Sequence, residues 1–350
     1  MKFIDLFAGI GGFRIALENN GNECVFTSEI DSFCQKVYND NFGTIPAGDI
    51  TKIDAKDIPD FDILAAGFPC QPFSYAGKLE GFSDKTRGTL FFDVVRIIKE
   101  KKPKMFLLEN VKGIVSHDHG RTLKTIVETL SDIGYRFYWT VIDSHDFGVP
   151  QHRHRWYCVG FDKNIAFSFP EGTNPNTTLR DIVVPDEDDP SLKLTKFECD
   201  RIDYHFAHAK PGDRVQHDNS KYGPNTKKGK YGIYSFQKPD GSLRFHVGDY
   251  AKTQIQEAYY CSLDSVSPAI IAARSPKLLE YRRHLSILEC KRLQGFPDNF
   301  IMDESDQQAR KQLGNSVSIP VIDAIVKNMM KAYEDNIAVP RCVTLDDYQE

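Results

Sequence analysis

The sequence predicts an α/β fold, in which a mostly parallel, doubly wound sheet is joined by a smaller β-rich part. Through the first half of the 350 residues, short apolar runs alternate with amphipathic stretches of helical length. This alternation is typical of a parallel sheet with helices on both faces. From about residue 175 the chain becomes rich in Pro, Asn, Thr and acidic residues, which predicts exposed loops before a second structural unit.

Each element of the larger sheet is expected from its own pattern. Short apolar runs predict strands at 2–7, 23–28, 62–66, 104–108, 137–142 and 155–160. Longer periodic stretches predict helices at 12–20, 31–41, 88–101 and 120–133, and a further one at 319–333. Polar residues stand at or just beyond several strand ends, among them Glu29, Cys70 and Glu109. Because parallel strands end at one edge of a sheet, these residues predict an active-site crevice there.

Composition narrows the class of protein. The chain is 41% apolar, enough for a core, and no apolar run approaches the ~20 residues that a membrane helix needs. Eight scattered cysteines without a Cys-x-x-Cys pair indicate neither a zinc site nor a disulfide framework. With no signal-peptide pattern at the start, we expect a reduced, cytoplasmic protein without a metal. The net charge of −5 argues only weakly against a nucleic-acid partner, since charge distribution matters more than the sum.

The segment 201–252 has the opposite charge. It carries ten Lys or Arg and five Asp, and aromatic residues are interleaved among them. Short strands separated by Gly, Pro and Asn predict an irregular β-rich module here. Basic and aromatic residues in this pattern favour nucleic-acid binding. The alternative is a solvated face with ordinary core aromatics.

The turn Phe7-Ala8-Gly9-Ile10-Gly11-Gly12 lies between a predicted strand and helix. Arg14 stands where a dinucleotide fingerprint needs its third glycine, which disfavours NAD. Glu29, at the next strand end, suits ribose hydroxyls, and Asp49 with Ile50 suits the amino group and face of adenine. Together they predict an adenosine site without phosphate recognition, which S-adenosylmethionine fits.

Phe68-Pro69-Cys70-Gln71-Pro72 follows the apolar run 63–67 directly. The two prolines fix the backbone on either side of the cysteine. A lone cysteine is more often a buried structural residue. At the carboxyl end of a strand in an open sheet, however, a thiol lies where such folds bind ligands.

Taken with Glu109, Gln151-His152-Arg153-His154-Arg155 and Gly314-Asn315-Ser316-Val317, this loop makes the chain resemble the DNA cytosine-5 methyltransferases of restriction-modification systems. The resemblance covers residues 1–170 and about 282–330. It implies a class I, Rossmann-like S-adenosylmethionine-dependent methyltransferase fold with a smaller target-recognition domain. The implied catalytic domain is 1–180 together with 298–340, and 181–297 holds the target-recognition domain and a bracing motif.

The resemblance also implies the chemistry. A cysteine thiolate, here Cys70, adds to C6 of a flipped-out cytosine so that C5 becomes nucleophilic. Glu109 is expected to protonate N3, and Arg155 to contact the cytosine carbonyl. Arg153 is expected to support the Cys70 loop or a phosphate, and Gln71 to belong to the catalytic set.

The remaining site residues follow the same motifs. Expected cofactor-binding residues are Phe7, Gly9, Gly11, Glu29, Ile30, Asp49, Ile50, Leu90, Asn315 and Val317. At Ile30, the contact to adenine is expected to be aliphatic where the family often has an aromatic ring. Expected DNA-binding residues are Ser74, Lys78, Lys85, Arg87 and Gln151. Most of these lie in a glycine-containing segment that we expect to close over duplex DNA; the alternative is a disordered surface loop.

Some positions depart from the family pattern. Leu288 stands where arginine is usual, Ile287 where proline is common, and Ala269 where a threonine is typical. The first two touch the bracing motif, and Ala269 puts one contact near the flipped base in doubt. Two alternatives to a DNA methyltransferase remain, an RNA cytosine-5 methyltransferase and a non-catalytic DNA-binding homologue. The protein is expected to be a monomer, and a cognate restriction endonuclease would be a functional rather than a physical partner.

Overall fold

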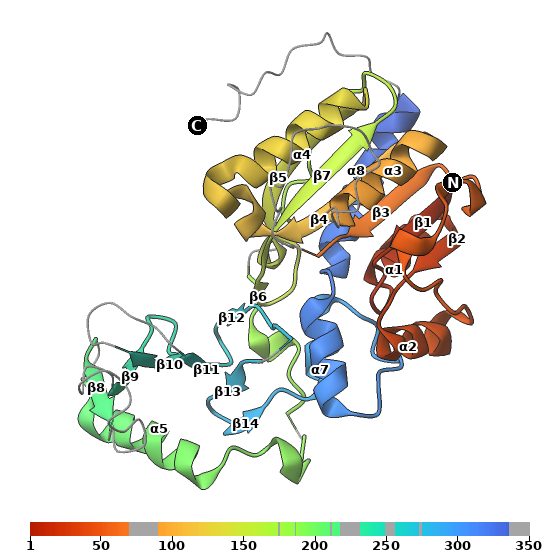
Figure 1. Cartoon of the computed structure of the whole chain (residues 1–350). Coiled ribbons are helices and arrows are strands. Elements are labelled where there is room, and N and C mark those ends of the chain that lie inside the picture. Colours follow the sequence, from red (N-terminus) through yellow and green to blue (C-terminus); the bar gives the residue numbers. More distant parts are fainter. Residues whose placement is uncertain are drawn as a thin grey trace.

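The computed structural model describes residues 1–69, 90–173, 176–185, 187–210, 212–217, 232–248, 256–272 and 275–335. Its larger sheet contains six strands in the order β2-β1-β3-β4-β7-β5 (Figure 1). Their bounds are β1 Lys2–Leu6, β2 Glu23–Ser28, β3 Ile63–Gly67, β4 Met105–Val111, β5 Arg136–Asp143 and β7 His154–Phe161. Only β7 runs antiparallel to its neighbours, β4 and β5, while β2, β1, β3 and β4 pair in parallel. The prediction of a mostly parallel sheet is confirmed.

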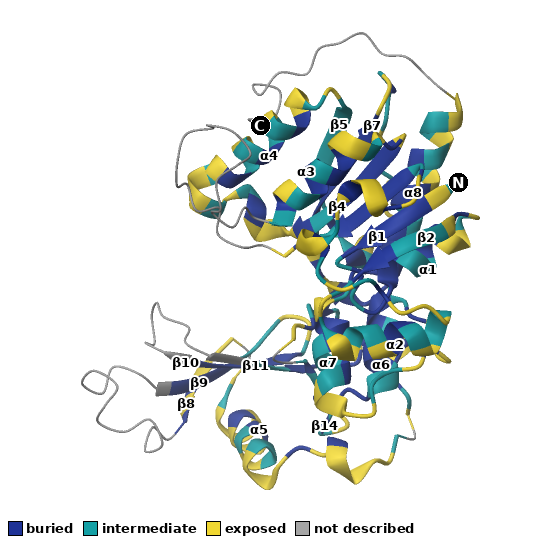
Figure 2. Cartoon of the chain, turned by 45° about the vertical axis from the view of Figure 1, so that its right-hand side comes forward, coloured by how far each residue is buried: buried dark blue, intermediate teal, exposed yellow. Residues whose placement is uncertain are grey.

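Helices cover both faces of this sheet. Their bounds are α1 Gly12–Asn19, α2 Ser32–Phe42, α3 Leu90–Lys101, α4 Arg121–Asp132 and α8 Ile319–Asp335. Neighbouring strand residues alternate between two hydrophobic cores: Phe3 packs with α1 and α8, and Ile4 packs with α3 and α4. Figure 2 shows the strands as the most deeply buried layer between the helices. This alternation is why apolar residues are needed on both sides of each strand.

Short elements connect the larger ones. The 3₁₀ turns are η1 Ile50–Lys52, η2 Ala55–Asp57, η3 Lys112–Val115, η4 His117–Gly120, η5 Ser144–Asp146, η6 Leu179–Asp181 and η7 Pro190–Leu192. A two-stranded parallel pair joins β6 Gln151–His152 to β12 Ser267–Pro268. This pair links residues 267–268, which follow the basic segment 201–252 in the chain, to residues 151–152, which directly precede β7.

A second sheet of six strands has the order β14-β13-β11-β10-β9-β8. The bounds are β8 Arg214–His217, β9 Gly232–Gln237, β10 Leu243–Gly248, β11 Gln256–Cys261, β13 Lys277–Leu278 and β14 Arg283–His284. Helix α5, Lys196–His208, packs on one face around Ile202, Leu243 and Phe245. The small sheet lies between α5 and the larger sheet in both views (Figures 1 and 2). The expected β-rich module is therefore present, but it begins with a helix that its pattern did not predict.

A buried polar network joins α5 to the small sheet. Nδ1 of His205 and Nε2 of His217 each lie 2.7 Å from the hydroxyl of Ser235, which is fully buried. Because the hydroxyl has one proton, at most one of the two imidazoles accepts from it, and at least one donates to its oxygen. Burial, with smaller contributions from Arg201 and His205, lowers the pKa of His217 to about 4.

The His217 pKa predicts acid-sensitive stability. Between pH 6.5 and about 4, the unfolded chain binds a proton at His217 that the folded chain does not. This contribution, roughly 3 kcal/mol at 1.36 kcal/mol per pKa unit, is present above pH 6.5 and is lost as the pH falls toward 4. In urea unfolding, the free-energy gap between the wild type and His217→Gln is expected to narrow from pH 7.5 to 4.5. A gap that stays constant would contradict the buried neutral imidazole.

Two further helices, α6 Ile287–Gln294 and α7 Asp306–Asn315, follow the small sheet. Helix α6 begins with a capping box, in which Ser286 and Glu289 each accept from the other's backbone N–H. Leu288 and Ile287 lie partly buried in its first turn. The departures from the family pattern at these positions therefore leave the helix start intact.

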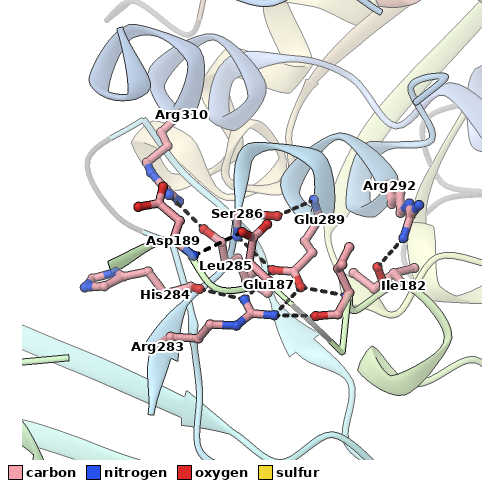
Figure 3. Close-up of polar contacts among 11 residues, drawn as sticks. Ile182, Glu187, Asp189, Arg283, His284, Leu285, Ser286, Glu289, Arg292 and Arg310 are labelled. Carbon is pink, nitrogen blue, oxygen red and sulfur yellow. Dashed lines mark hydrogen bonds and ion pairs between the residues drawn. The ribbon is translucent and has the colours of Figure 1, made fainter. Parts of the chain in front are cut away.

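Figure 3 shows the ion pair at the base of α6. The Arg283 guanidinium meets the Glu289 carboxylate with both of its terminal nitrogens, at 2.6 and 2.7 Å. The Glu289 side chain is fully buried and that of Arg283 is 5% exposed. Backbone groups of Val184 complete the pair, since its N–H donates to Glu289 and its carbonyl accepts from Arg283. The pair thus holds segment 182–184 against α6.

Glu289→Gln is expected to destabilise the protein by about 3–5 kcal/mol, because it leaves the buried Arg283 charge without its partner. Asp264→Asn is the matched control, since Asp264 forms an exposed bidentate pair with Arg180. It should cost much less than the Glu289 change, because solvent screens an exposed pair. The measurement is the urea midpoint of each variant at pH 7. Equal losses of stability for the two variants would show that the buried Arg283–Glu289 pair stabilises the protein no more than the exposed pair does.

Among the described residues, no helix has the length and apolar character that crossing a bilayer requires.

Candidate active site

One cavity of about 470 Å³ opens at the carboxyl ends of β1 to β4. Nine of the ten expected cofactor-binding residues line it, namely Phe7, Gly9, Glu29, Ile30, Asp49, Ile50, Leu90, Asn315 and Val317. Glu109, Arg153 and Arg155 line it as well. The structure therefore brings together strand-end residues of the first half and residues 315–317 near the end of the sequence.

The turn after β1 is shaped by left-handed backbone. Phe7 and Gly9 have φ values of +58° and +55°, and a side chain in this region is costly at Phe7. The N–H of Gly9 donates to one oxygen of Glu29 at 2.8 Å, and the N–H of Asp31 donates to the other at 2.8 Å. Both Glu29 oxygens are thus fixed in direction, and each retains a lone pair that can accept from a ligand.

Gly11 is the predicted cofactor residue that does not line the cavity. Its φ is +91°, and a Cβ there would lie 2.4 Å from the ring of Phe42. Gly11 is therefore needed for the start of α1 and for packing. Its neighbour Gly12 lines the cavity instead, where a Cβ would lie 2.8 Å from Val317. The close approach of residues 316–317 to this turn depends on Gly12.

The far side of the cavity combines a carboxylate with apolar surface. Asp49 accepts from the N–H and hydroxyl of Thr51 at 3.0 and 2.7 Å, and these bonds lower its pKa. Ile50 is buried beside it, whereas Ile30 is 71% exposed at the rim. Leu90 is the first residue of α3. A charged acceptor next to aliphatic side chains can bind a flat heterocycle that carries an amino group.

Glu109 and Arg155 form the polar centre of the cavity's catalytic side. Arg155 Nε lies 3.2 Å from a Glu109 oxygen, and their side chains are 13% and 12% exposed. Burial raises the pKa of Glu109, while Arg155 and Arg153 act in the opposite direction. A Cβ on Gly67 would lie 3.5 Å from the second Glu109 oxygen, so glycine at this strand end keeps the approach to the carboxyl open.

The structure buries two residues of the motif that contains Arg155. Arg153 is 2% exposed and donates to the carbonyls of Ile270, Gly314 and Ser316. Gln151, expected to contact DNA, is fully buried; it donates to the Leu293 carbonyl at 2.9 Å and accepts from Ile270 N–H at 2.8 Å.

The burial of Gln151 and that of Arg153 have the same physical cause. The predicted strand 155–160 begins at residue 154, and residues 151–153 belong to the junction between the two sheets. There, polar side chains satisfy backbone groups that would otherwise be buried without partners. Gln151 and Arg153 therefore position the site from behind, and Arg155 alone of the three forms part of the Glu109 pair.

The residues Cys70, Gln71, Ser74, Lys78, Lys85 and Arg87 lie outside the described residues. Pro69 and Leu90, which flank this segment, both line the cavity. The sequence offered only one indication that Asn110 belongs to the site, its position beside Glu109. Its side chain is 2% exposed and donates to the Phe68 carbonyl at 2.8 Å. It ties the end of β4 to the residues just before Cys70. Among the described residues, no cluster of His, Cys, Asp or Glu is placed to bind an ion.

The chain matches the family model for C-5 cytosine-specific DNA methylases over residues 1–331. It is 39% identical over 333 residues to Type II methyltransferase M.HhaI of Haemophilus parahaemolyticus, covering 94% of each chain. It is 42% identical over 335 residues to Type II methyltransferase M.NlaX of Neisseria lactamica, covering 95% of this chain and 96% of the relative.

Solved structures show the same fold at lower identity. The S. pombe Dnmt2 methyltransferase superposes with a TM-score of 0.64 at 17% identity, covering 95% of this chain and 98% of that one. A putative DNA modification methyltransferase from an E. coli prophage gives 0.66 at 20% identity, covering 95% and 99%. These likenesses confirm the expected methyltransferase fold. By its match over nearly the whole sequence and its identity to these relatives, the chain belongs to the C-5 cytosine-specific DNA methylases.

Proposed function

We propose that this protein is the modification enzyme of a type II restriction-modification system, which methylates C5 of a flipped-out cytosine within one duplex DNA sequence. The observation that carries the proposal is the single cavity in which the Glu109–Arg155 pair adjoins the subsites at Glu29 and Asp49. A base and an adenosine-containing methyl donor could meet there within one enclosed volume.

The cavity's donor set fits S-adenosylmethionine. Glu29 offers two oriented carboxylate oxygens for ribose hydroxyls, and Asp49 offers an acceptor for the adenine amino group. Ile50, Leu90 and Ile30 would cover the adenine faces with aliphatic surface. When bound, the cofactor supplies an electrophilic methyl group on a sulfonium. Asn315 and Val317 belong to the opposite wall.

The protein's own residues would activate the base. The Cys70 thiolate adds to C6, and the ring electrons that this addition displaces are accommodated as Glu109 delivers a proton to N3. A raised pKa keeps Glu109 protonated to higher pH than an exposed glutamic acid. Arg155 orients Glu109 through Nε and has further N–H groups for the cytosine carbonyl. At the end, loss of the C5 proton expels the thiolate and restores the aromatic ring. Gln71, which follows Cys70 directly in the sequence, is assigned to the same catalytic set.

Recognition of DNA is assigned to the rest of the chain. Residues 1–180 with 298–340 form the catalytic domain in this proposal, and 181–297 form the target-recognition domain with its brace. The two separate six-stranded sheets support that division. Ser74, Lys78, Lys85 and Arg87 would contact the DNA backbone near the flipped base. The enzyme would act as a cytoplasmic monomer, with its endonuclease as a separate protein.

The test is methyl incorporation from labelled S-adenosylmethionine into duplex DNA and into transfer RNA, followed by bisulfite sequencing of the DNA. Label in DNA at one recurring sequence is the expected result. Label in transfer RNA alone would establish the RNA alternative. No transfer and no covalent adduct with 5-fluorocytosine DNA would establish the non-catalytic alternative.

A further inference from the structure

Gln312 is the unexplained polar residue of the cavity wall. It lies on α7, lines the cavity and is only 3% exposed. Neither the nitrogen nor the oxygen of its side-chain amide has a hydrogen-bond partner among the residues that the structure describes. Buried amides are almost always paired, and an unpaired one weakens the folded state. Such a group beside a cavity calls for a ligand.

The position of Gln312 indicates which part of a ligand it would meet. Its neighbour Lys311 pairs with Asp31 at 3.0 Å, two residues beyond Glu29. The segment that follows α7 packs on the turn after β1, where Val317 and Ser316 lie against Gly12. Gln312 therefore belongs to the wall formed by this turn and residues 314–317, whereas Asp49 and Ile50 form the adenine subsite proposed above.

We propose that the Gln312 amide binds the amino-acid end of the cofactor, an inference that rests on the proposed use of S-adenosylmethionine. That end carries a carboxylate, which accepts hydrogen bonds, and an ammonium, which donates them. A neutral amide offers a separate donor and acceptor, one for each of these groups, without adding charge. It is suited to a cavity that already holds Glu29 and Asp49.

Binding requires the amide to turn. Both of its polar atoms are shielded in the unliganded protein, and rotation of the flexible side chain brings them to the cavity surface. The unpaired amide thus weakens the free protein and strengthens the complex. A residue with a purely structural role would affect both states alike.

The experiment measures binding rather than turnover. Calorimetry compares S-adenosylhomocysteine with 5′-deoxy-5′-methylthioadenosine, which lacks the amino-acid end. Gln312→Met keeps the side-chain length without the amide. It is expected to weaken S-adenosylhomocysteine binding by about 10- to 100-fold, the range for a hydrogen bond to a charged group, and to change methylthioadenosine binding by less than about twofold. The melting temperature of its unliganded form should stay equal or rise. Gln307→Met, on the exposed side of α7, is the matched control and should bind both ligands as the wild type does.

A second variant keeps the test decisive if Gln312→Met folds poorly. Gln312→Glu retains size and an acceptor but repels a carboxylate, so it should also lose affinity for S-adenosylhomocysteine selectively. Equal effects on both ligands, no effect on either, or a lower melting temperature without ligand selectivity would overturn the inference. A wild-type protein that binds neither ligand would instead refute the proposed cofactor.

Discussion

Cys70→Ala is expected to reduce methyl transfer to duplex DNA by about 10⁴-fold or more, the scale on which loss of a covalent nucleophile acts in other enzymes. Cytosine C5 is a weak nucleophile, and only addition at C6 makes it reactive enough to accept a methyl group. Cys34, the cysteine that lines the cavity among the described residues, is not suited to replace it, because burial raises the pKa of its thiol to about 12. The measurement is single-turnover transfer of label with enzyme in excess over DNA.

Cofactor binding separates a chemical role of Cys70 from a structural one. The alanine variant should bind S-adenosylhomocysteine as the wild type does and should form no adduct with 5-fluorocytosine DNA. Cys199→Ala, in the half-buried part of α5, serves as control and should keep activity within about twofold. Loss of cofactor affinity in Cys70→Ala, with the control intact, would mean that the cysteine supports the loop instead of attacking the base.

Glu109→Gln is expected to slow the same single-turnover step by about 10²- to 10⁴-fold, the usual contribution of a positioned general acid. Glutamine can still donate a hydrogen bond to N3, but it cannot transfer a proton. Glu128→Gln, at an exposed position on α4, should leave the rate unchanged. Because the change removes the charge that pairs with Arg155 at 3.2 Å, the melting temperature and cofactor affinity of the variant are measured as well, and rates are compared with folded, cofactor-saturated protein.

The pH profile distinguishes proton transfer from hydrogen bonding alone. Burial raises the pKa of Glu109, so the acid form persists above the ordinary range of a glutamic acid and is depleted as the pH rises further. The wild-type rate should therefore fall on the alkaline side as Glu109 ionises, and the slow rate of Glu109→Gln should lack this fall. An alkaline limb of equal steepness in both proteins would assign the titration to another group.

Much of the larger sheet could be predicted because its signals are local. Helices cover both faces of the sheet, so its strands appear in the sequence as short apolar runs rather than as alternating apolar and polar residues. Strand β3 was expected at 62–66 and lies at Ile63–Gly67, and α3, expected at 88–101, lies at Leu90–Lys101. The strand-end rule then placed Glu29 and Glu109 at one edge without knowledge of the pairing.

Helices α5 and α6 begin with a sequence signal that our predictions did not use. Thr195 and Glu198 form a capping box at the start of α5, as Ser286 and Glu289 do at the start of α6. Both have the Ser/Thr-x-x-Glu spacing that marks a helix start in sequence. The Gly, Pro and Asn residues of segment 201–252 favoured short strands instead.

Other features could not be read from the sequence at all. Gln151 and Arg153 have partners 117 to 163 residues away along the chain. No local pattern distinguishes a buried guanidinium bonded to three carbonyls from one that faces a phosphate. The same holds for Gln312, whose lack of partners is visible only when its surroundings are known.

The junction around Arg153 limits how chimeric enzymes can be built. The Arg153 guanidinium bonds to Ile270, which lies between β11 and β13, and to Gly314 and Ser316 beside the cavity, so it holds these two segments together. A transplanted reading module that ended beyond residue 270 would bring a foreign backbone into this clamp and disturb methyl transfer as well as sequence choice. An exchange that ends after β11 and before Ser267 keeps the clamp native, so that this part of the small sheet could be replaced without loss of turnover, while β13 and β14 stay native.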